Sequence, residues 1–268
     1  MQSAALRRAG GRWYTSHYFA PGADAVYFRD AFGRALAGGC FGRMPKLAPH
    51  VVRSRLSREC QLVVKDVNTF LSIGWLASTF DVRVIGVSRH LGAIYASELR
   101  RFGPGWDPDP EILLAQRDLM ADHLSPYEEV LRNAQSAAAR RAMLIASRLR
   151  VFANEAAAAP DWLVVSYERL AASPMPEFRA MFETLDLGWD DAVARYVDRN
   201  TTREQSGTYL TARRSEDHID QWRTELRRDE IAEVEAVVEE FGLAEWIFRD
   251  GLHTGGGARS TRADSDVL

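Results

Sequence analysis

Two side chains in the middle of the chain could together hold a phosphate group. Arg89 directly follows an apolar, β-branched run over residues 82–88, and Ser97 lies eight residues further on. Ligands of open α/β sheets bind outside the carboxyl ends of the strands, and the start of a following helix favours an anion there. An arginine fork can hold phosphate through two hydrogen bonds. Either residue alone is common in a structural role, but strand, spacing and helix together predict an anion site.

Lys65 is a further candidate for an anion contact. Only Lys46 and Lys65 are lysines among the 34 basic residues, so the chain strongly favours arginine. A lysine kept at the end of the apolar run over 61–65 would supply a compact ammonium in place of a planar fork. Chance is the alternative explanation, and the two stay open.

The elements expected around these residues alternate between strand and helix. Apolar runs predict strands over 61–65, 82–88 and 161–167. Helical periodicity predicts helices over 24–36, 69–79, 92–100, 111–129, 133–155, 176–185, 189–198 and 228–241. This order indicates an α/β fold with a parallel sheet covered by helices. We expect loops over 103–110 and 201–215, one domain over 1–252 and a disordered tail over 253–268.

The composition excludes several classes of protein. Charged residues make up 26% of the chain, the net charge is −3, and the basic residues are scattered, which argues against nucleic-acid binding. No apolar run approaches the roughly 20 residues that span a bilayer, and the N-terminus lacks a signal-peptide core. Cys40 and Cys60 cannot supply a disulfide framework or a four-thiolate zinc site. We therefore expect a cytoplasmic protein.

Four segments in order resemble sulfotransferases that use 3′-phosphoadenosine-5′-phosphosulfate (PAPS). The segment 84–97, Val-Ile-Gly-Val-Ser-Arg-His-Leu-Gly-Ala-Ile-Tyr-Ala-Ser, resembles the motif that binds the donor's 3′-phosphate. Three more match in family order: 63–67 with Trp75 resembles a Lys-Asp-Pro segment of bacterial members, 164–170 with Ser173-Pro174 resembles a Tyr-Glu-x-Leu segment, and 213–226 resembles the C-terminal basic loop and Trp-Arg stretch. Each motif is weak alone, whereas four in order, covering about residues 60–250, are specific.

The resemblance implies a P-loop-like parallel sheet flanked by helices, and transfer of a sulfuryl group from PAPS to a hydroxyl acceptor without a metal. Its motifs assign catalysis to Lys65 and Asp66, and donor binding to Arg89, Ser97, Tyr167, Arg213 and Arg214. Tyr167 would lie near the adenine, although a tyrosine at a strand end can also simply pack. For Glu168, His90 and Trp222 we expect structural roles and no direct contact with the ligand.

The chain departs from the family pattern at two positions. Leu91 replaces the proline that usually follows the arginine by two residues, and Val67 replaces a histidine that serves many members as general base. Asp66 is the next candidate for that base. It could equally cap the following helix, because aspartate is a favoured cap, so the identity of the base stays open.

The family's opening strand and phosphate loop have no counterpart before Lys65. The glycine pairs Gly10-Gly11 and Gly38-Gly39 follow no apolar strand and read as turns. Either the chain is N-terminally incomplete, which the retained Arg, Lys and Tyr favour, or it is an inactive paralogue that binds a nucleotide or acts as a scaffold. Loss of the first strand would expose a strand edge, so we expect low stability and self-association into a homo-oligomer. A kinase loop of the type Gly-x-x-x-x-Gly-Lys-Ser/Thr is absent.

Overall fold

The computed structural model describes residues 17–36, 63–65, 67, 69–202, 219–244 and 253–254. The chain divides into two compact units, Met1–Val82 and Arg83–Leu268. The first unit contains α2 (Val26–Leu36), the 3₁₀ turn η3 (Phe70–Ser72) and α4 (Ile73–Thr79).

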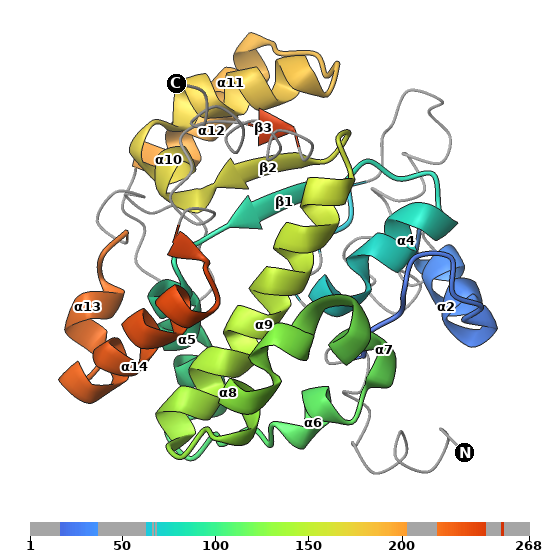
Figure 1. Ribbon diagram of the computed structural model, residues 1–268. Helices are drawn as coiled ribbons and strands as arrows, with labels where there is room; N and C mark the ends of the chain where they lie inside the picture. Colours follow the sequence, from blue (N-terminus) through green and yellow to red (C-terminus); the bar gives the residue numbers. More distant parts are fainter. Residues whose placement is uncertain are drawn as a thin grey trace, which may run out of the picture. The chain divides into compact units, whose positions relative to one another are not determined.

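Trp75 is the centre of the first unit. Its side chain is fully buried, and its Nε1 donates a hydrogen bond to the carbonyl oxygen of Ala23 at 2.9 Å. The rings of Phe19, Phe32 and Phe80 pack around the indole, with centroid distances of 5.4, 6.0 and 6.1 Å. Because the buried N–H is satisfied and aromatic neighbours cover the ring, Trp75 holds α2 and α4 side by side (Figure 1).

The strand predicted over 61–65 is wrong for the part that the structure describes. Residues 63–65 carry no strand, and Val63 and Val64 are 80% and 51% exposed. A parallel strand of apolar residues is stable when both of its faces are covered, and these two valines lack that cover. The helix predicted over 69–79 is present, but its first turn is the 3₁₀ segment η3.

A small sheet lies in the second unit, within a chain that is mostly helical. Strands β1 (Ile85–Ser88) and β2 (Leu163–Ser166) run parallel, and their last residues, Ser88 and Ser166, lie opposite each other. Figure 1 shows both arrows pointing the same way. The predicted α/β class and the parallel pairing of these two strands are confirmed, although each strand is shorter than its apolar run.

The tail predicted to be disordered begins with two strand residues. Strand β3 (His253–Thr254) pairs antiparallel with the other edge of β2, where Val164 lies opposite His253. An open strand edge presents unpaired N–H and C=O groups that recruit an extended segment, and this pairing overrides the polar composition of the tail. Residues 255–268 lie outside the described part of the chain, and the single domain over 1–252 stays a prediction.

Helices make up most of the second unit. Their bounds are α5 Leu91–Phe102, α6 Glu111–Leu114, α7 Arg117–Leu119, the π-helical turn η4 Met120–Leu124, the 3₁₀ turn η5 Ser125–Tyr127, α8 Glu128–Arg132, α9 Ala137–Ala158, α10 Tyr167–Ala172, α11 Pro174–Thr184, α12 Asp191–Thr202, α13 Trp222–Glu225 and α14 Arg228–Glu240. Among the described residues, no helix is both long and apolar enough to cross a membrane.

Local chemistry explains where the predicted helices begin and break. Ser136 accepts a hydrogen bond from the N–H of Ala139 at 2.9 Å, so α9 starts after this cap instead of at residue 133. The single helix predicted over 111–129 is instead a series of short turns, α6 to α8. Pro126 lies in the first turn of η5, and proline has no N–H to continue a helical ladder. The predicted loop over 103–110 contains no helix or strand, as expected.

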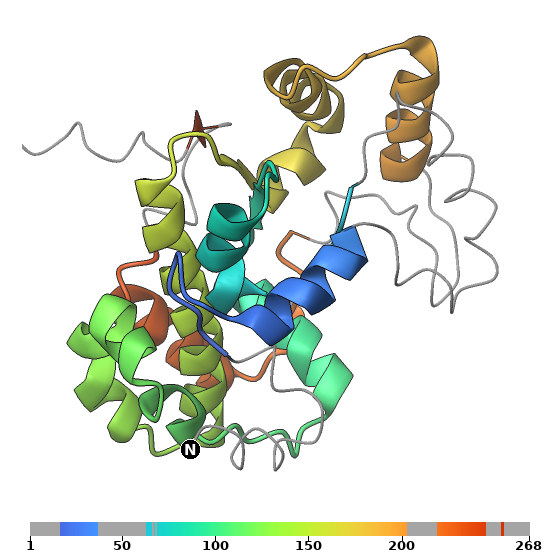
Figure 2. The same ribbon diagram turned by 90° about the vertical axis from the view of Figure 1, so that its right-hand side faces the viewer.

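Helices α9 and α11 pack against the two strands of the sheet. The ring of Phe152, on α9, packs directly over Gly86 of β1, where an added Cβ would lie 1.9 Å from Cζ. On β2, Leu163 and Val165 form a small core with Met181 of α11. Helices α10, α11 and α12 follow β2 in the chain and lie together at one end of this unit (Figures 1 and 2).

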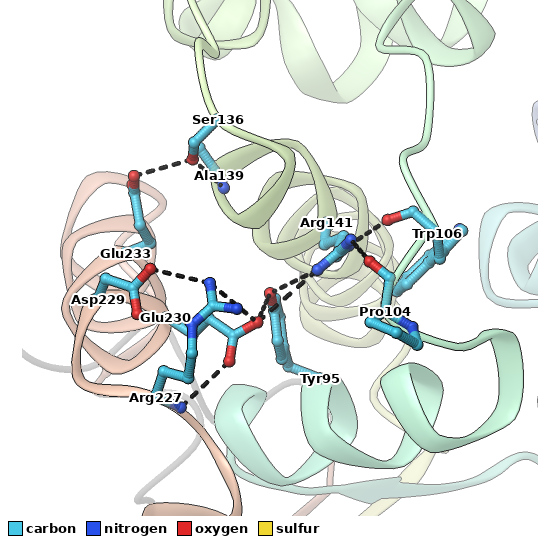
Figure 3. Close-up of polar contacts among 10 residues, drawn as sticks. All are labelled: Tyr95, Pro104, Trp106, Ser136, Ala139, Arg141, Arg227, Asp229, Glu230 and Glu233. Atoms are coloured by element: carbon cyan, nitrogen blue, oxygen red, sulfur yellow. Dashed lines mark hydrogen bonds and ion pairs between the residues drawn. The ribbon is translucent and has the colours of Figure 1, made fainter.

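A buried polar network joins α5, α9 and α14 (Figure 3). The Tyr95 hydroxyl donates to Oε1 of Glu230 at 3.2 Å, and Nη1 of Arg141 lies 3.4 Å from that hydroxyl and 3.7 Å from that carboxylate. Arg141 also donates to the carbonyl oxygens of Pro104, at 2.5 Å, and Trp106. Arg141 and Glu230 are only 5% and 3% exposed, and buried charges are tolerated when paired in this way. The network therefore ties α5, the helix that follows β1, to α14.

We expect Gly86→Ala to lower the free energy of unfolding by about 1–3 kcal/mol, the usual cost of overpacking a core. The added methyl must displace the buried ring of Phe152 or shift β1. Gly105→Ala is the control, because nothing lies within 4 Å of a Cβ there, and its cost should stay within about 0.5 kcal/mol. Urea unfolding of wild type and the two variants measures both changes in the free energy of unfolding. Equal stability of Gly86→Ala and wild type would contradict the packing of α9 on β1.

Candidate functional site

Arg89 and Tyr167 lie together at the carboxyl end of the parallel strands. Each is the first residue after its strand, and the two strands end in register at Ser88 and Ser166. The guanidinium carbon of Arg89 lies 4.2 Å from the centroid of the Tyr167 ring. A guanidinium stacked in this way gains cation–π attraction and keeps its N–H donors in the plane of the fork, available to an oxyanion. The strand-end position predicted for both residues is confirmed.

The donors of Arg89 are not used up inside the described part of the chain. Its Nε is buried and has no hydrogen-bond partner there, and no described carboxylate lies within ion-pair distance of the guanidinium. Leaving a buried donor unpaired costs about 1–3 kcal/mol, more when the group is charged. The Nε atoms of Arg148 and Arg150 are unpaired in the same way, but those two guanidinium groups have acceptors at Nη. Arg89 has no such acceptor among the described residues, so its Nη groups could pair with an anion.

Ser97 lies on an exposed part of α5. The helix places it about two turns beyond its first residue, so its hydroxyl is open to solvent. The structure brings Arg89 and Tyr167 into contact, whereas it gives no hydrogen bond between Ser97 and either of them among the described residues. A role for Ser97 in holding the same anion as Arg89 stays a prediction.

Internal acceptors already occupy donors at the start of α5. His90 caps the helix, and its Nδ1 accepts a hydrogen bond from the N–H of Gly92 at 3.1 Å. The N–H of His90 itself donates to Oε1 of Glu168 at 2.9 Å. The expectation that free N–H groups of this helix start would bind the anion is therefore wrong for these two groups. Arg89 is left as the main contact for an anion at this strand end.

Glu168 connects the ends of the two strands. Its Oε1 accepts from the backbone of His90, on the β1 side, and its Oε2 accepts from the hydroxyl of Ser166, the last residue of β2, at 3.0 Å. The structural role expected of Glu168, as a partner of backbone groups, is confirmed. The carboxylate fixes the two residues that flank Arg89 and Tyr167.

The ring of His90 packs against the C-terminal part of the unit. It stacks on Trp222 with a centroid distance of 4.4 Å and an interplanar angle of 16°, and Trp222 is 2% exposed. Gly92 allows this approach, since an added Cβ would lie 2.4 Å from the indole. Arg223 covers the indole at 4.3 Å. His90 and Trp222 are therefore structural, as expected, and they hold α13 against the start of α5.

The surroundings of His90 keep its imidazole neutral. Burial lowers the pKa of His90 below 6.5, and the positive charge of Arg223 lowers it further. The carboxylates of Glu168, Asp220 and Glu235 act in the opposite direction, with a smaller effect than burial. A neutral ring whose Nδ1 accepts a hydrogen bond carries its proton on Nε2, so protonation of Nδ1 would remove the cap from α5.

The structure leaves open how the remaining predicted site residues lie relative to this pair. Lys65 belongs to the first unit, where it is exposed and follows no strand. Asp66, Arg213 and Arg214 lie outside the described residues, so their roles stay predictions. Across the described ranges, no group of three or more His, Cys, Asp or Glu side chains could hold a metal ion.

The sequence reasoning missed the buried charges behind the site. Helical spacing contained a signal for Arg141, because Ala138, Ala142 and Ile145 lie on the same side of α9 and are buried. A charged residue on that face predicts a buried partner. No local pattern identifies the partner as Glu230, which lies far along the chain.

Comparisons with known proteins do not assign this chain to a family. No protein-family model, curated protein or solved structure matches it. The chemistry of the residues at the strand ends and the order of the sequence motifs therefore carry the evidence for function.

We expect His90→Asn to reduce the loss of stability on acidification. The folded-state pKa of His90 lies below its unfolded value of 6.5, so the unfolded chain takes up protons first as pH falls. The stabilisation from neutral His90 is complete above pH 6.5 and declines as pH falls from there towards the lowered pKa. Asparagine keeps a cap acceptor and cannot titrate.

Urea unfolding of wild type and His90→Asn at pH 7.5 and pH 5 measures this difference. The variant should show the smaller change, with a loss at pH 7.5 of about 0.5–1.5 kcal/mol from the missing ring stack. The pKa of His17 is also lowered by burial, and its contribution to the pH dependence of stability should remain in both proteins. An identical pH dependence in the two proteins would contradict the neutral cap.

Proposed function

We propose that this protein binds PAPS through its 3′-phosphate and transfers the sulfuryl group to a hydroxyl acceptor. The observation that supports it most is the guanidinium of Arg89, stacked on Tyr167 at the end of a parallel strand pair, with a buried Nε that has no partner in the described chain. The four motifs in sulfotransferase order support the 3′-phosphate of PAPS as the anion that binds there. A P-loop-like fold in a cytoplasmic bacterial enzyme belongs to the same proposal.

The site chemistry suits the nucleotide end of the donor. A phosphate dianion offers oxygens that accept two parallel N–H bonds from one arginine, which would satisfy the donors that Arg89 keeps free. Adenine stacks readily on aromatic side chains and on guanidinium planes, and Tyr167 and Arg89 supply one of each. Arg213 and Arg214 would add positive charge at the same phosphate, and Ser97 would add a hydroxyl donor.

Transfer itself needs groups beyond this pair. In the proposed reaction the acceptor oxygen forms a bond to sulfur, the bond between sulfur and the 5′-phosphate oxygen breaks, and 3′,5′-adenosine bisphosphate leaves. The acceptor proton passes to a base, a role that we assign to Asp66. Lys65 would neutralise charge that develops on the leaving phosphate, as positively charged groups do in phosphoryl transfer. No metal takes part in this scheme.

Nucleotide binding without turnover is the second candidate. It is favoured by one observation: the described residues 63–65 form no strand and are exposed, so Lys65 does not lie at the end of a sheet strand as the transfer scheme expects. Incubation with sulfur-labelled PAPS and a panel of hydroxyl acceptors separates the two candidates. Labelled product supports the transferase, and tight binding of the bisphosphate with no labelled product supports the binding protein.

We expect Arg89→Ala to weaken the binding of 3′,5′-adenosine bisphosphate by about ten- to a hundredfold. This range corresponds to the loss of hydrogen bonds to a charged group, about 1.5–3 kcal/mol. Isothermal titration calorimetry at low salt measures the two dissociation constants.

Arg179→Ala is the matched control for the loss of one positive charge. Arg179 lies on α11, its side chain is 65% exposed, and it pairs only with Glu183 among the described residues. Its removal should leave the affinity within about twofold, because an exposed charge outside the site is largely screened. Equal affinities of wild type and Arg89→Ala would refute the site, and no binding by wild type would refute the proposed function.

A further inference from the structure

We propose that Glu168 is a positioning residue for anion binding, which clamps the ends of β1 and β2 so that Arg89 stays stacked on Tyr167. The effect on nucleotide affinity rests on the proposed function, whereas the clamp itself does not. Glu168 touches neither ring nor guanidinium in the described contacts. It acts through the residues next to them.

The geometry of the clamp is specific to this place in the chain. Oε1 of Glu168 holds the N–H of His90, the residue directly after Arg89, at 2.9 Å. Oε2 holds the hydroxyl of Ser166, the residue directly before Tyr167, at 3.0 Å. One carboxylate therefore fixes a neighbour of each member of the stacked pair.

Both groups that Glu168 holds are buried. His90 and Ser166 are each 8% exposed, whereas Glu168 is half-buried and its two hydrogen bonds are partly buried. Hydrogen bonds to an ionised acceptor are shorter and stronger than those between neutral groups. Without the carboxylate, the N–H of His90 would lose its partner, and the turn that carries Arg89 would relax to find another. The guanidinium would then no longer be fixed on the ring before the ligand arrives.

The charge of Glu168 allows a sharp test. A purely electrostatic role and a positioning role predict opposite changes in anion affinity when the carboxylate is removed. A carboxylate this close to an anion site repels the ligand, so its removal alone would tighten binding of a phosphate. A positioning carboxylate predicts weaker binding when both hydrogen bonds are lost. Glutamine separates the two effects, since it removes the charge and keeps an oxygen for the N–H of His90.

The experiment compares wild type, Glu168→Ala and Glu168→Gln by calorimetry with 3′,5′-adenosine bisphosphate and by hydrogen exchange at the His90 amide. We expect Glu168→Ala to weaken binding by about tenfold, the scale of one lost hydrogen bond to a charged group, and to speed exchange at His90. Glu168→Gln should restore slow exchange and bring the affinity back to within about threefold of wild type. If Glu168→Ala does not fold, Ser166→Ala, which removes one of the two contacts, should give a smaller loss in the same direction.

Glu177→Ala is the control for general loosening of the neighbouring helices. Glu177 is a carboxylate of α11 that is 7% exposed and binds Arg169 of α10, at 3.0 Å from Nε. Its loss should lower the melting temperature without changing exchange at His90 or the affinity. Tighter binding by both Glu168 variants, or unchanged His90 exchange in Glu168→Ala, would overturn the clamp. If wild type binds no bisphosphate, the proposed function fails, and the exchange measurement alone decides the clamp.

Discussion

The in-register parallel pairing of β1 with β2 is the constraint on which the site depends. Ser88 lies opposite Ser166, so the next residue of each chain segment, Arg89 and Tyr167, emerges at the same edge of the sheet. A slip by one residue would turn every side chain of the slipped strand to the other face of the sheet and separate the guanidinium from the ring. The contact of Phe152 with Gly86 holds β1 in place, because only glycine accepts so close an approach.

The rest of the second unit holds the start of α5 from the opposite side. Trp222 packs on His90 and Gly92, and the buried network of Tyr95, Arg141 and Glu230 joins α5 to α9 and α14. These contacts tie the turn after β1 to α9 and to two helices, α13 and α14, that lie much further along the chain. A binding group keeps its geometry when its neighbours are themselves packed and hydrogen-bonded, and Arg89 meets this condition through His90. The guanidinium of Arg89 has no hydrogen-bond partner within the described residues. The site therefore has ordered neighbours around a positive charge that is free to pair with a ligand.

Local sequence patterns were sufficient for the parts of the fold that depend on one segment. The apolar runs before Arg89 and Tyr167 predicted strands whose carboxyl ends meet, and the structure has them. The strand predicted from an apolar run over 61–65 was wrong for its described residues, because an apolar run does not show whether other parts of the fold will cover it. The pairing of His253 with β2 depends on an edge left open elsewhere in the fold. The contacts of Glu168 with His90 and of Glu230 with Tyr95 join residues distant in the chain, so local sequence patterns did not identify these pairs.

The central claim is that Arg89 recognises the 3′-phosphate of an adenine nucleotide. The most direct test compares the dissociation constants of 3′,5′-adenosine bisphosphate and 5′-adenosine monophosphate in wild type and in Arg89→Ala. The two ligands differ only in the 3′-phosphate, so their ratio isolates its contribution. The account predicts that wild type prefers the bisphosphate by about tenfold or more and that Arg89→Ala loses most of this preference. A wild-type protein that binds both ligands equally, or a variant that keeps the full preference, would contradict it.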